Sequence, residues 1–247
     1  MTEIEEKMSR WEIPAEVDDP AWAEKRLAAS SIRRLLERFI ESEASVETYR
    51  EIAAKADTLY EALLKEPSIK SREVFLSGQF AERHIEMKDR SVMVGNTNPI
   101  APPIVITDYG EKVSGTLPLD SRFSGAPGLC HGGIIASILD EVLGHACIVR
   151  GYQVVTQILT IRYLRPTLLD GETYSEASIR EIDGRKITVD GALYVGGTRV
   201  ASAEGIFVDV RGERFGEIFK RALREIPIED GNAAEAANDP AKAQSAS

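Results

Sequence analysis

Hydrophobic and polar positions repeat with different periods in different parts of the chain. Between residues 20 and 66 the apolar positions recur every three or four residues, which predicts two amphipathic helices at 20–40 and 45–66. From Ile104 onward the period shortens, and residues 104–108 and 112–117 are predicted to be short strands. The change of period at about residue 104 predicts a helical segment that is followed by a sheet.

The second half of the chain is predicted to be almost entirely β. Four segments rich in β-branched residues lie at 154–164, 173–182, 186–195 and 199–210. Asp183-Gly184 and Gly196-Gly197 are typical of two-residue hairpin turns. We therefore predict four consecutive antiparallel strands in a meander. With the preceding helix they define an α+β fold, a curved antiparallel sheet wrapped around one helix.

That central helix begins just after His131 and runs through residues 134–148. Apolar residues cover most of its circumference, so we expect it to be buried. Its polar and small residues, Ser137, Asp140, Glu141 and Gly144, are three or four positions apart and form one narrow stripe. The helix opens on a histidine and two glycines, where the first backbone amides have no partner within the helix.

The spacing of His131 and Asp140 limits what this helix can do alone. Nine residues correspond to about 13.5 Å along the axis and a rotation that leaves the two groups on opposite sides. They can act on one reacting atom only if a second copy of the helix runs antiparallel beside the first, with Gly144 permitting close approach. The spacing thus predicts a two-fold dimer that pairs Asp140 of one chain with the helix start of the other.

Such a site suits a particular chemistry. The free amides at Gly132 and the helix dipole would polarise a carbonyl oxygen. Asp140 would then attack the carbonyl carbon, or activate a water that does so. No strong general acid is present for the leaving group, and a thiolate does not need one because a thiol has a pKa near ~8.5. The residues therefore favour cleavage of a thioester.

A longer motif carries a family resemblance. The pattern G-x-P-G-x-x-H-G-G begins at Gly125, and an aspartate follows nine residues after its histidine. It resembles the hotdog-fold acyl-CoA thioesterases of the phenylacetyl-CoA (PaaI-like) type, near the human thioesterase-superfamily branch that acts on long-chain acyl-CoA. The similarity continues through 155–157, 162–166, 184–186 and 203–207 and covers roughly 91–210.

The resemblance implies roles for four residues. Asp140 matches the catalytic carboxylate, His131 and Gly132 match the helix-start pair that polarises the thioester carbonyl, and Thr156 matches a strand hydroxyl that positions the water or the aspartate. The resemblance implies neither a metal nor a redox cofactor, since coenzyme A is part of the substrate. Four cationic residues are candidate ligands for the phosphates of coenzyme A, namely Arg162, Arg165, Arg185 and Lys186.

These patterns divide the chain into five parts. We expect a disordered N-terminus at 1–19, a helical segment with an antiparallel helical hairpin at 20–90, and a hotdog thioesterase domain at 91–211. An amphipathic C-terminal helix is predicted at 212–228 and a disordered low-complexity tail at 229–247. The helical hairpin is expected to pack on itself or on the main domain.

Composition narrows the setting of the protein. A formal net charge of -10 over 247 residues argues against nucleic-acid binding, which needs a basic face. No apolar run approaches the ~18 residues of a membrane span, and the acidic N-terminus does not resemble a secretory signal. Two cysteines suggest no disulfide framework. We expect a cytoplasmic homodimer or dimer of dimers.

Two alternatives to acyl-CoA hydrolysis remain. A hotdog enoyl-CoA hydratase is suggested by Asp140 and His145, five residues apart, although those enzymes place such a pair in a loop ahead of the helix. A non-catalytic acyl-CoA-binding regulator would use the N-terminal hairpin to bind a partner. His145 is expected to be a hydrogen-bonded histidine in the dimer interface, because three scattered histidines make no metal site.

Overall fold

The computed structural model describes residues 13, 16–169, 171–211, 221 and 223–225. Residues 1–211 belong to one compact unit and 212–247 to a second. Most of the expected disordered segment 1–19 and all of the expected tail 229–247 lie outside the described residues. Of the predicted C-terminal helix 212–228, residues 221 and 223–225 are described and are helical.

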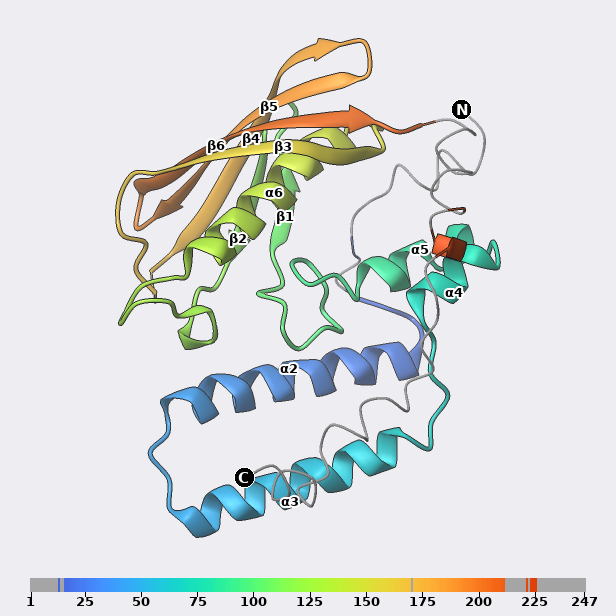
Figure 1. Ribbon diagram of the computed structural model, residues 1–247, viewed down its shortest axis with the longest axis vertical. Helices are drawn as coiled ribbons and strands as arrows, with labels where there is room; N and C mark the ends of the chain where they lie inside the picture. The colour runs from blue at the N-terminus through green and yellow to red at the C-terminus, as the bar shows by residue number, and fades with distance from the viewer. Residues whose placement is uncertain (1–12, 14–15, 170, 212–220, 222, 226–247) are drawn as a thin grey trace, which may run out of the picture. The chain divides into compact units, whose positions relative to one another are not determined.

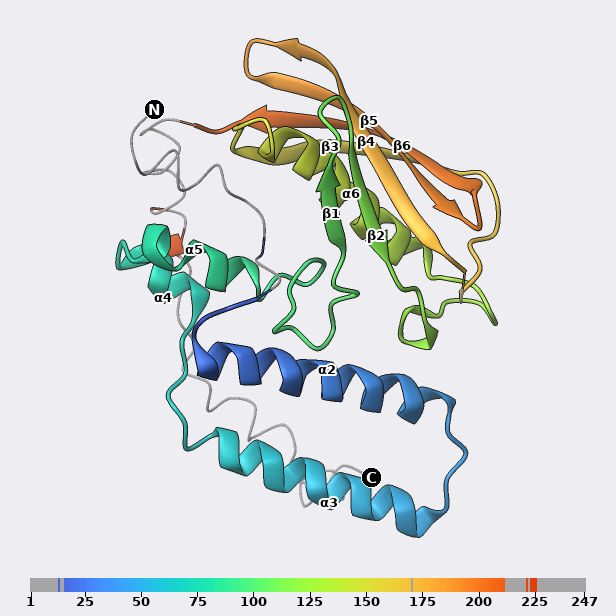
Figure 2. The same ribbon diagram turned by 180° about the vertical axis from the view of Figure 1, so that it is seen from behind.

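The main unit is built on a six-stranded antiparallel sheet with a single long helix, α6, across one face (Figures 1 and 2). Helix α6 spans Gly132–Ile148. The strands are β1 (Val105–Asp108), β2 (Val113–Leu117), β3 (Val154–Tyr163), β4 (Thr173–Asp183), β5 (Lys186–Val195) and β6 (Thr198–Asp209). This is the hotdog fold, and it confirms the α+β prediction.

The order of the strands differs from the predicted four-strand meander. Strands β4, β5 and β6 do follow one another as hairpins, with Gly184, Gly196 and Gly197 in the left-handed conformation at the turns. Strand β3, however, pairs with β6 and forms one edge of the sheet. Because α6 crosses the sheet between β2 and β3, the chain re-enters on the far side of the hairpins. Period-two alternation identifies a strand's faces, but it does not identify its neighbours.

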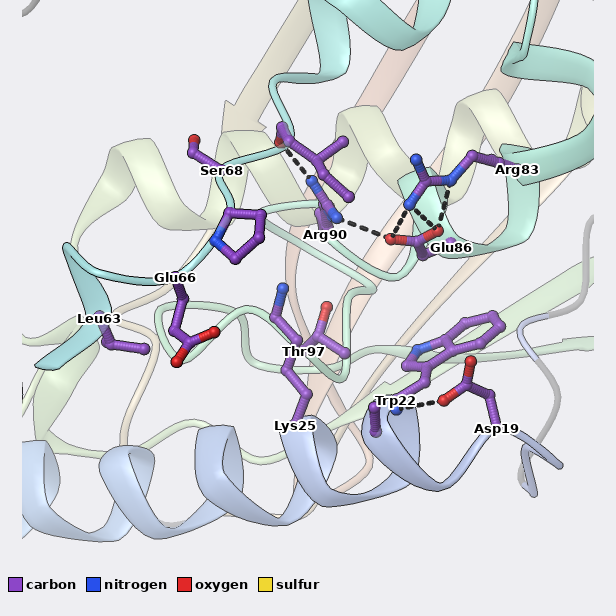
Figure 3. Close-up of a pocket in the computed structure, with 13 residues that line it drawn as sticks. Asp19, Trp22, Lys25, Leu63, Glu66, Ser68, Arg83, Glu86, Arg90 and Thr97 are labelled. Atoms are coloured by element: carbon purple, nitrogen blue, oxygen red, sulfur yellow. Dashed lines mark hydrogen bonds and ion pairs between the residues drawn. The ribbon is translucent and has the colours of Figure 1, made fainter.

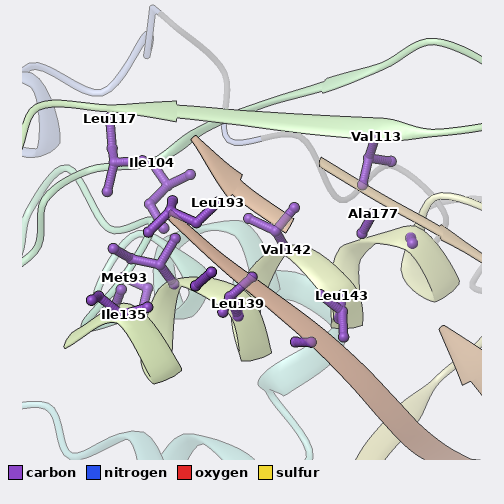
Figure 4. Packing of buried hydrophobic residues seen from close by; sticks show 14 of the residues in the cluster. Met93, Ile104, Val113, Leu117, Ile135, Leu139, Val142, Leu143, Ala177 and Leu193 are labelled. Atoms are coloured by element: carbon purple, nitrogen blue, oxygen red, sulfur yellow. The ribbon is translucent and has the colours of Figure 1, made fainter. Parts of the chain in front are cut away.

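Three strand positions that face helix α6 are glycines. The helix side chains Leu139, Val142 and Leu143 are fully buried, and Figure 4 shows them within the core. A Cβ atom at Gly115 would come within 2.8 Å of Val142, and a Cβ at Gly191 would overlap the Leu143 side chain. A Cβ added at Gly205 would come within 3.0 Å of the Leu143 side chain. The glycines therefore form the surface on which the helix is seated.

Gly144 also belongs to this contact. It is buried, and a Cβ added there would meet the Phe207 ring at 3.7 Å. The expectation that Gly144 lies on the exposed stripe beside Asp140 is therefore wrong. The stripe that remains partly exposed contains Gly133, Ser137 and Asp140 with Glu141.

Among the described residues, four helices precede the sheet. Helices α2 (Pro20–Glu41) and α3 (Val46–Leu63) run antiparallel (Figures 1 and 2), and the side chains of Asp19 and Ser45 cap their N-termini. Two shorter helices follow, α4 (Ser71–Leu76) and α5 (Phe80–Lys88). The hydrophobic pattern of 67–103 did not predict these two, because six to nine residues hold too few turns to show a period.

Helices α2 and α3 differ in how much they contact the rest of the chain. Helix α2 is fixed by polar contacts: Arg33 donates to the carbonyl oxygens of Asn96 and Asn98, and Arg26 pairs with the buried Asp89 at 2.9 Å. Helix α3 buries no residue. Its large apolar side chains stay exposed within the described chain, including Val46, Leu59, Tyr60 and Leu63.

The glycine contact predicts the effect of one added methyl group. Gly191→Ala should lower the free energy of unfolding by about 1–3 kcal/mol, because the new Cβ overlaps Leu143 in a closely packed core. The matched control is Gly144→Ala, where the Cβ finds ordinary contact and helix propensity improves by up to about 1 kcal/mol. Urea unfolding measures both variants. Equal effects of the two substitutions would contradict the proposed packing of α6 against the strand glycines.

Candidate active site

A carboxylate on the exposed stripe of α6 meets a hydroxyl from the edge strand. The Thr156 hydroxyl on β3 donates to Asp140 Oδ1 at 2.8 Å. Asp140 and its neighbour Glu141 are partly exposed, whereas the positions on the opposite side of α6 are buried against the sheet. The hydrogen bond orients the carboxylate through Oδ1, and no hydrogen bond from the described residues reaches Oδ2.

The start of α6 is capped by its own histidine. His131 is the N-cap residue, with extended backbone angles, and its Nδ1 accepts the Gly133 amide hydrogen at 3.0 Å. A ring nitrogen that accepts a hydrogen bond carries no proton, so the proton of the neutral imidazole lies on Nε2. The exposed ring of His131 therefore presents an N–H donor.

One backbone amide at this helix start has no acceptor. The amides of Ile134 and Ile135 both donate to the carbonyl oxygen of His131, and that of Gly133 donates to the histidine ring. Among the described residues, the Gly132 amide meets no acceptor. It stands at the positive end of the helix dipole, which favours binding of a negatively charged oxygen.

Tyr163 is a residue of this site to which the sequence assigned no role. Its hydroxyl donates to the carbonyl oxygen of Gly132 at 3.0 Å, and its ring lies beside the same glycine. With Gly133 bonded to His131, the peptide between Gly132 and Gly133 is held from both sides. Regular alternation along β3 would place Tyr163 and Thr156 on opposite faces of the sheet, so the sequence alone did not predict that Tyr163 contacts α6.

A β-bulge in β3 makes both contacts of this strand possible. Thr156 and Tyr163 are seven residues apart, and an odd separation places side chains on opposite faces of a regular strand. Thr156 pairs with Phe207 and Ile158 with Ile206, so Gln157 is an extra residue in the ladder. The bulge inverts the alternation, and both Thr156 and Tyr163 face α6.

The two halves of the site do not meet in one chain. Asp140 and Gly132 are eight residues apart in the same straight helix, which is about 12 Å at 1.5 Å per residue. A carbonyl oxygen bound at Gly132 would therefore place its carbon beyond hydrogen-bond reach of Asp140. We refer to these two separate locations on α6 as half-sites.

The four cationic residues expected to bind phosphates are also separated. Arg162 lies near the end of β3 with Arg165 beyond it, while Arg185 and Lys186 lie at the turn between β4 and β5. Lys186 and Val155 are both opposite Val208 of β6, so the two pairs are about 20 Å apart along the strands. One chain does not gather them.

Beside Asp140, the side chains of Glu141 and His145 have altered acid–base properties. Burial raises the pKa of Glu141 to about 7, against the nearby charge of Lys88 and with a small contribution from Asp140. Burial, with help from Lys88, lowers the pKa of His145 to about 4. His145 Nδ1 lies 2.9 Å from the Glu141 carbonyl oxygen. The ring is only 4% exposed in its own chain, so it is not the interface histidine that the sequence suggested.

Two general features complete the geometry. In the part of the chain that the structure describes, no three or more His, Cys, Asp or Glu side chains are grouped so as to hold a metal ion. None of the described helices has the length and apolar character needed to cross a membrane.

Comparison with known proteins agrees with this fold. Residues 127–202 match the family model of the thioesterase superfamily. A crystal structure of a thioesterase superfamily protein superposes with a TM-score of 0.65 at 28% identity, covering 75% of this chain and 90% of the other. The resemblance to hotdog-fold thioesterases is thus confirmed, and with it the class of thioester hydrolase.

Two shorter structures are also similar. The thioesterase superfamily protein of Shewanella loihica PV-4 is 26% identical, covers 44% of this chain and 91% of its own, and has a TM-score of 0.39. The PaaI protein of the E. coli phenylacetic acid degradation operon is 23% identical, covers 45% and 82%, and has a TM-score of 0.43.

The raised pKa of Glu141 predicts a pH-dependent cost of folding. Between about pH 4.5 and 7 the folded state holds a proton on Glu141 that the unfolded state releases, so stability falls as pH rises through this window. Glu141→Gln should therefore be as stable as the parent near pH 4.5. At pH 8 it should be more stable, by up to about 3 kcal/mol.

Urea unfolding of both proteins at pH 4.5 and pH 8, at one protein concentration, measures this difference. The opposing contribution of His145, whose lowered pKa reduces stability as pH falls from about 6.5 to 4, is common to both and cancels. A constant difference between the two proteins across this pH range would contradict the prediction.

Proposed function

We propose that the protein hydrolyses acyl-CoA thioesters to the free acid and coenzyme A, at sites that two copies of the chain share. The observation that carries the proposal is the pair of half-sites on α6. An oriented carboxylate at Asp140 and an unpaired amide at Gly132 lie on one helix but about 12 Å apart. The thioesterase superfamily match over 127–202 supports the reaction class.

The edge of the sheet supports the proposed pairing of two chains. Strand β3 pairs with β6 on one side only, and its Val155 and Ile158 side chains are 43% and 50% exposed. Uncovered, long apolar edge strands invite pairing with another chain. A two-fold axis near the middle of β3 would set two α6 helices antiparallel. Asp140 of each chain would then face Gly132 of the partner subunit.

The same two-fold axis explains the separated cations. In an antiparallel arrangement, the end of β3 that carries Arg162 lies beside the opposite end of the partner's sheet. Arg162 and Arg165 of one chain would thus approach Arg185 and Lys186 of the partner subunit. We propose that each such group binds the phosphates of coenzyme A, which are recognised by several converging cations.

The proposed reaction uses the chain's own groups at each step. The thioester carbonyl oxygen accepts hydrogen bonds from the Gly132 amide and from Nε2–H of His131, which stabilise the negative charge that develops there. Asp140, held by Thr156 through Oδ1, takes a proton from water at Oδ2 while the water oxygen attacks the carbonyl carbon. Direct attack by the same Asp140 oxygen is the alternative, and it uses the same half-sites.

The collapse of the intermediate requires little further help. The carbon–sulfur bond breaks, the coenzyme A thiolate leaves, and the proton taken from water passes from Asp140 to the sulfur. Because a thiol has a pKa near ~8.5, the sulfur leaves without a strong general acid. An amide or an alkyl ester has a far more basic leaving group, which would have to be protonated as its bond to carbon breaks.

The position of His145 weakens the hydratase alternative. Its ring is bonded to the Glu141 carbonyl oxygen and buried, so it is not presented beside Asp140 to a substrate. The alternative of a non-catalytic regulator finds support in the exposed apolar face of α3. Binding of acyl-CoA without release of thiol would favour that regulator over an enzyme.

Removal of the carboxylate should abolish turnover. We expect Asp140→Asn to lower kcat for thiol release by about 10²–10⁴, the usual contribution of a general base. Activity would be measured with acetyl, medium-chain, long-chain and aromatic CoA esters, and size-exclusion chromatography would show whether assembly is unchanged. Glu141→Gln, which removes a carboxylate one residue away, should stay within a few-fold of the parent. A fully active Asp140→Asn protein would refute the assignment.

Removal of a single amide hydrogen tests the other half-site. Gly132→Pro deletes the N–H but suits the first position of a helix, and His131 already has the extended backbone that a following proline requires. We expect kcat to fall by about 10²–10³. Gly132→Ala keeps the amide, and its Cβ would meet Tyr163 at an ordinary 3.6 Å, so it should remain active. Equal activities of the two variants would exclude the amide from the reaction.

Mixing the two inactive variants tests whether sites are shared. A dimer of one Asp140→Asn chain and one Gly132→Pro chain has one site with both defects and one with neither. Random reassociation makes about half of the dimers mixed, each with one intact site of two, so about a quarter of the activity should return. No recovery, with mixed dimers verified by mass spectrometry, would place both half-sites in one chain.

A further inference from the structure

A cavity of about 530 Å3 lies among the N-terminal helices. It is formed by the beginning of α2, the end of α3 and the segment after it, and α5 (Figure 3). Its volume is in the range of pockets that hold small organic ligands. None of its lining residues is Asp140, Thr156, His131 or Gly132.

Most of the charged groups in the cavity are already paired with one another. Glu86 accepts hydrogen bonds from both Arg83 and Arg90, and the carboxylate of Asp19 caps the start of α2. Arg90 also donates to the Ile69 carbonyl oxygen. One carboxylate thus serves two arginines, which leaves positive charge in excess around Glu86.

Lys25 adds a third cation to this group. Figure 3 shows its side chain extending from α2 toward Arg90. Among the described residues Lys25 has no hydrogen-bond or ion-pair partner. Partial burial lowers the pKa of Lys25, and repulsion from Arg90 lowers it further. Attraction to Glu86 and Asp89 raises this pKa and offsets only part of the two effects. The ammonium group therefore has no direct ion-pair partner among the described residues, although the charges of Glu86 and Asp89 attract it.

The opposite side of the cavity carries Leu63, Pro67 and Ile69, with Glu66 and Ser68 among them. Leu63, at the end of α3, is 70% exposed, and Ile69 is 41% exposed, with Pro67 between them. Both side chains are largely exposed to solvent and bury little of the rest of the described chain. The cavity therefore offers an unpaired cation at one side and apolar surface at the other.

We propose that this cavity binds a monocarboxylate with an apolar body, whose carboxylate pairs with Lys25 and whose body lies against Leu63 and Ile69. A singly charged anion fits better than a phosphate, because Asp19, Glu66 and Glu86 also line the cavity and would repel a multiply charged ligand. Monocarboxylates are also the class of acid that the proposed thioester hydrolysis releases. The binding site itself does not depend on that reaction.

Calorimetric titration of the full-length protein with octanoate tests the site. We expect saturable binding that Lys25→Gln weakens by roughly tenfold, the value of one hydrogen-bonded ion pair in a partly enclosed site. Lys55→Gln, the same change at an exposed lysine of α3, should bind octanoate as the parent does. Octanol, which keeps the apolar body without the charge, and inorganic phosphate, which keeps charge without the body, should bind more weakly than octanoate.

Three results would overturn the proposal. They are no saturable binding of octanoate, equal binding by the parent and Lys25→Gln, and octanol or phosphate binding as tightly as octanoate. Octanoate bound only as a product at the α6 half-sites would give the second result, because Lys25 is not part of them. The loss of thiol release in Asp140→Asn is a separate observation, so either proposal can fail without the other.

Discussion

The seating of α6 on the sheet is the contact on which the rest of the structure depends. A helix with a charged stripe can be held close to a sheet only if its remaining surface finds room there, and Gly115, Gly191 and Gly205 provide that room. Because Val142 and Leu143 enter the space above these glycines, the rotation of α6 about its axis is set. That rotation directs Asp140 away from the core and toward β3, where Thr156 can reach it.

Strand β3 must then run alongside α6 from Asp140 to Gly132. Helix α6 advances 1.5 Å per residue and a strand about 3.3 Å, so seven residues of β3 exceed the length between Asp140 and Gly132. The bulge at Gln157 uses one of those residues without a partner, and it returns Tyr163 to the face that carries Thr156. Both ends of the site on α6 are therefore supported by one strand, through two side-chain hydrogen bonds.

The sequence predicted those features that depend on local periodicity. The bounds of α6, the separation of Gly132 from Asp140 along it, and the hairpin turns between β4 and β6 all follow from spacing and turn residues. The position of β3 does not, because alternation carries no information about which strand lies beside it. Gly144 was misplaced because a glycine on a helix stripe can face either a partner or the sheet. Tyr163 was missed because its orientation depends on a bulge that no single residue type announces.

In the proposed dimer, dividing the site between two chains would have an energetic consequence at Asp140. Covering a carboxylate with a second chain removes water from it, and an unpaired buried charge costs several kcal/mol. The hydrogen bond from Thr156 replaces one of the lost water contacts in advance, before any partner arrives. The water or substrate held by the partner's helix start would replace another. The half-site is therefore arranged so that assembly leaves the charge of Asp140 solvated by groups that also take part in the reaction.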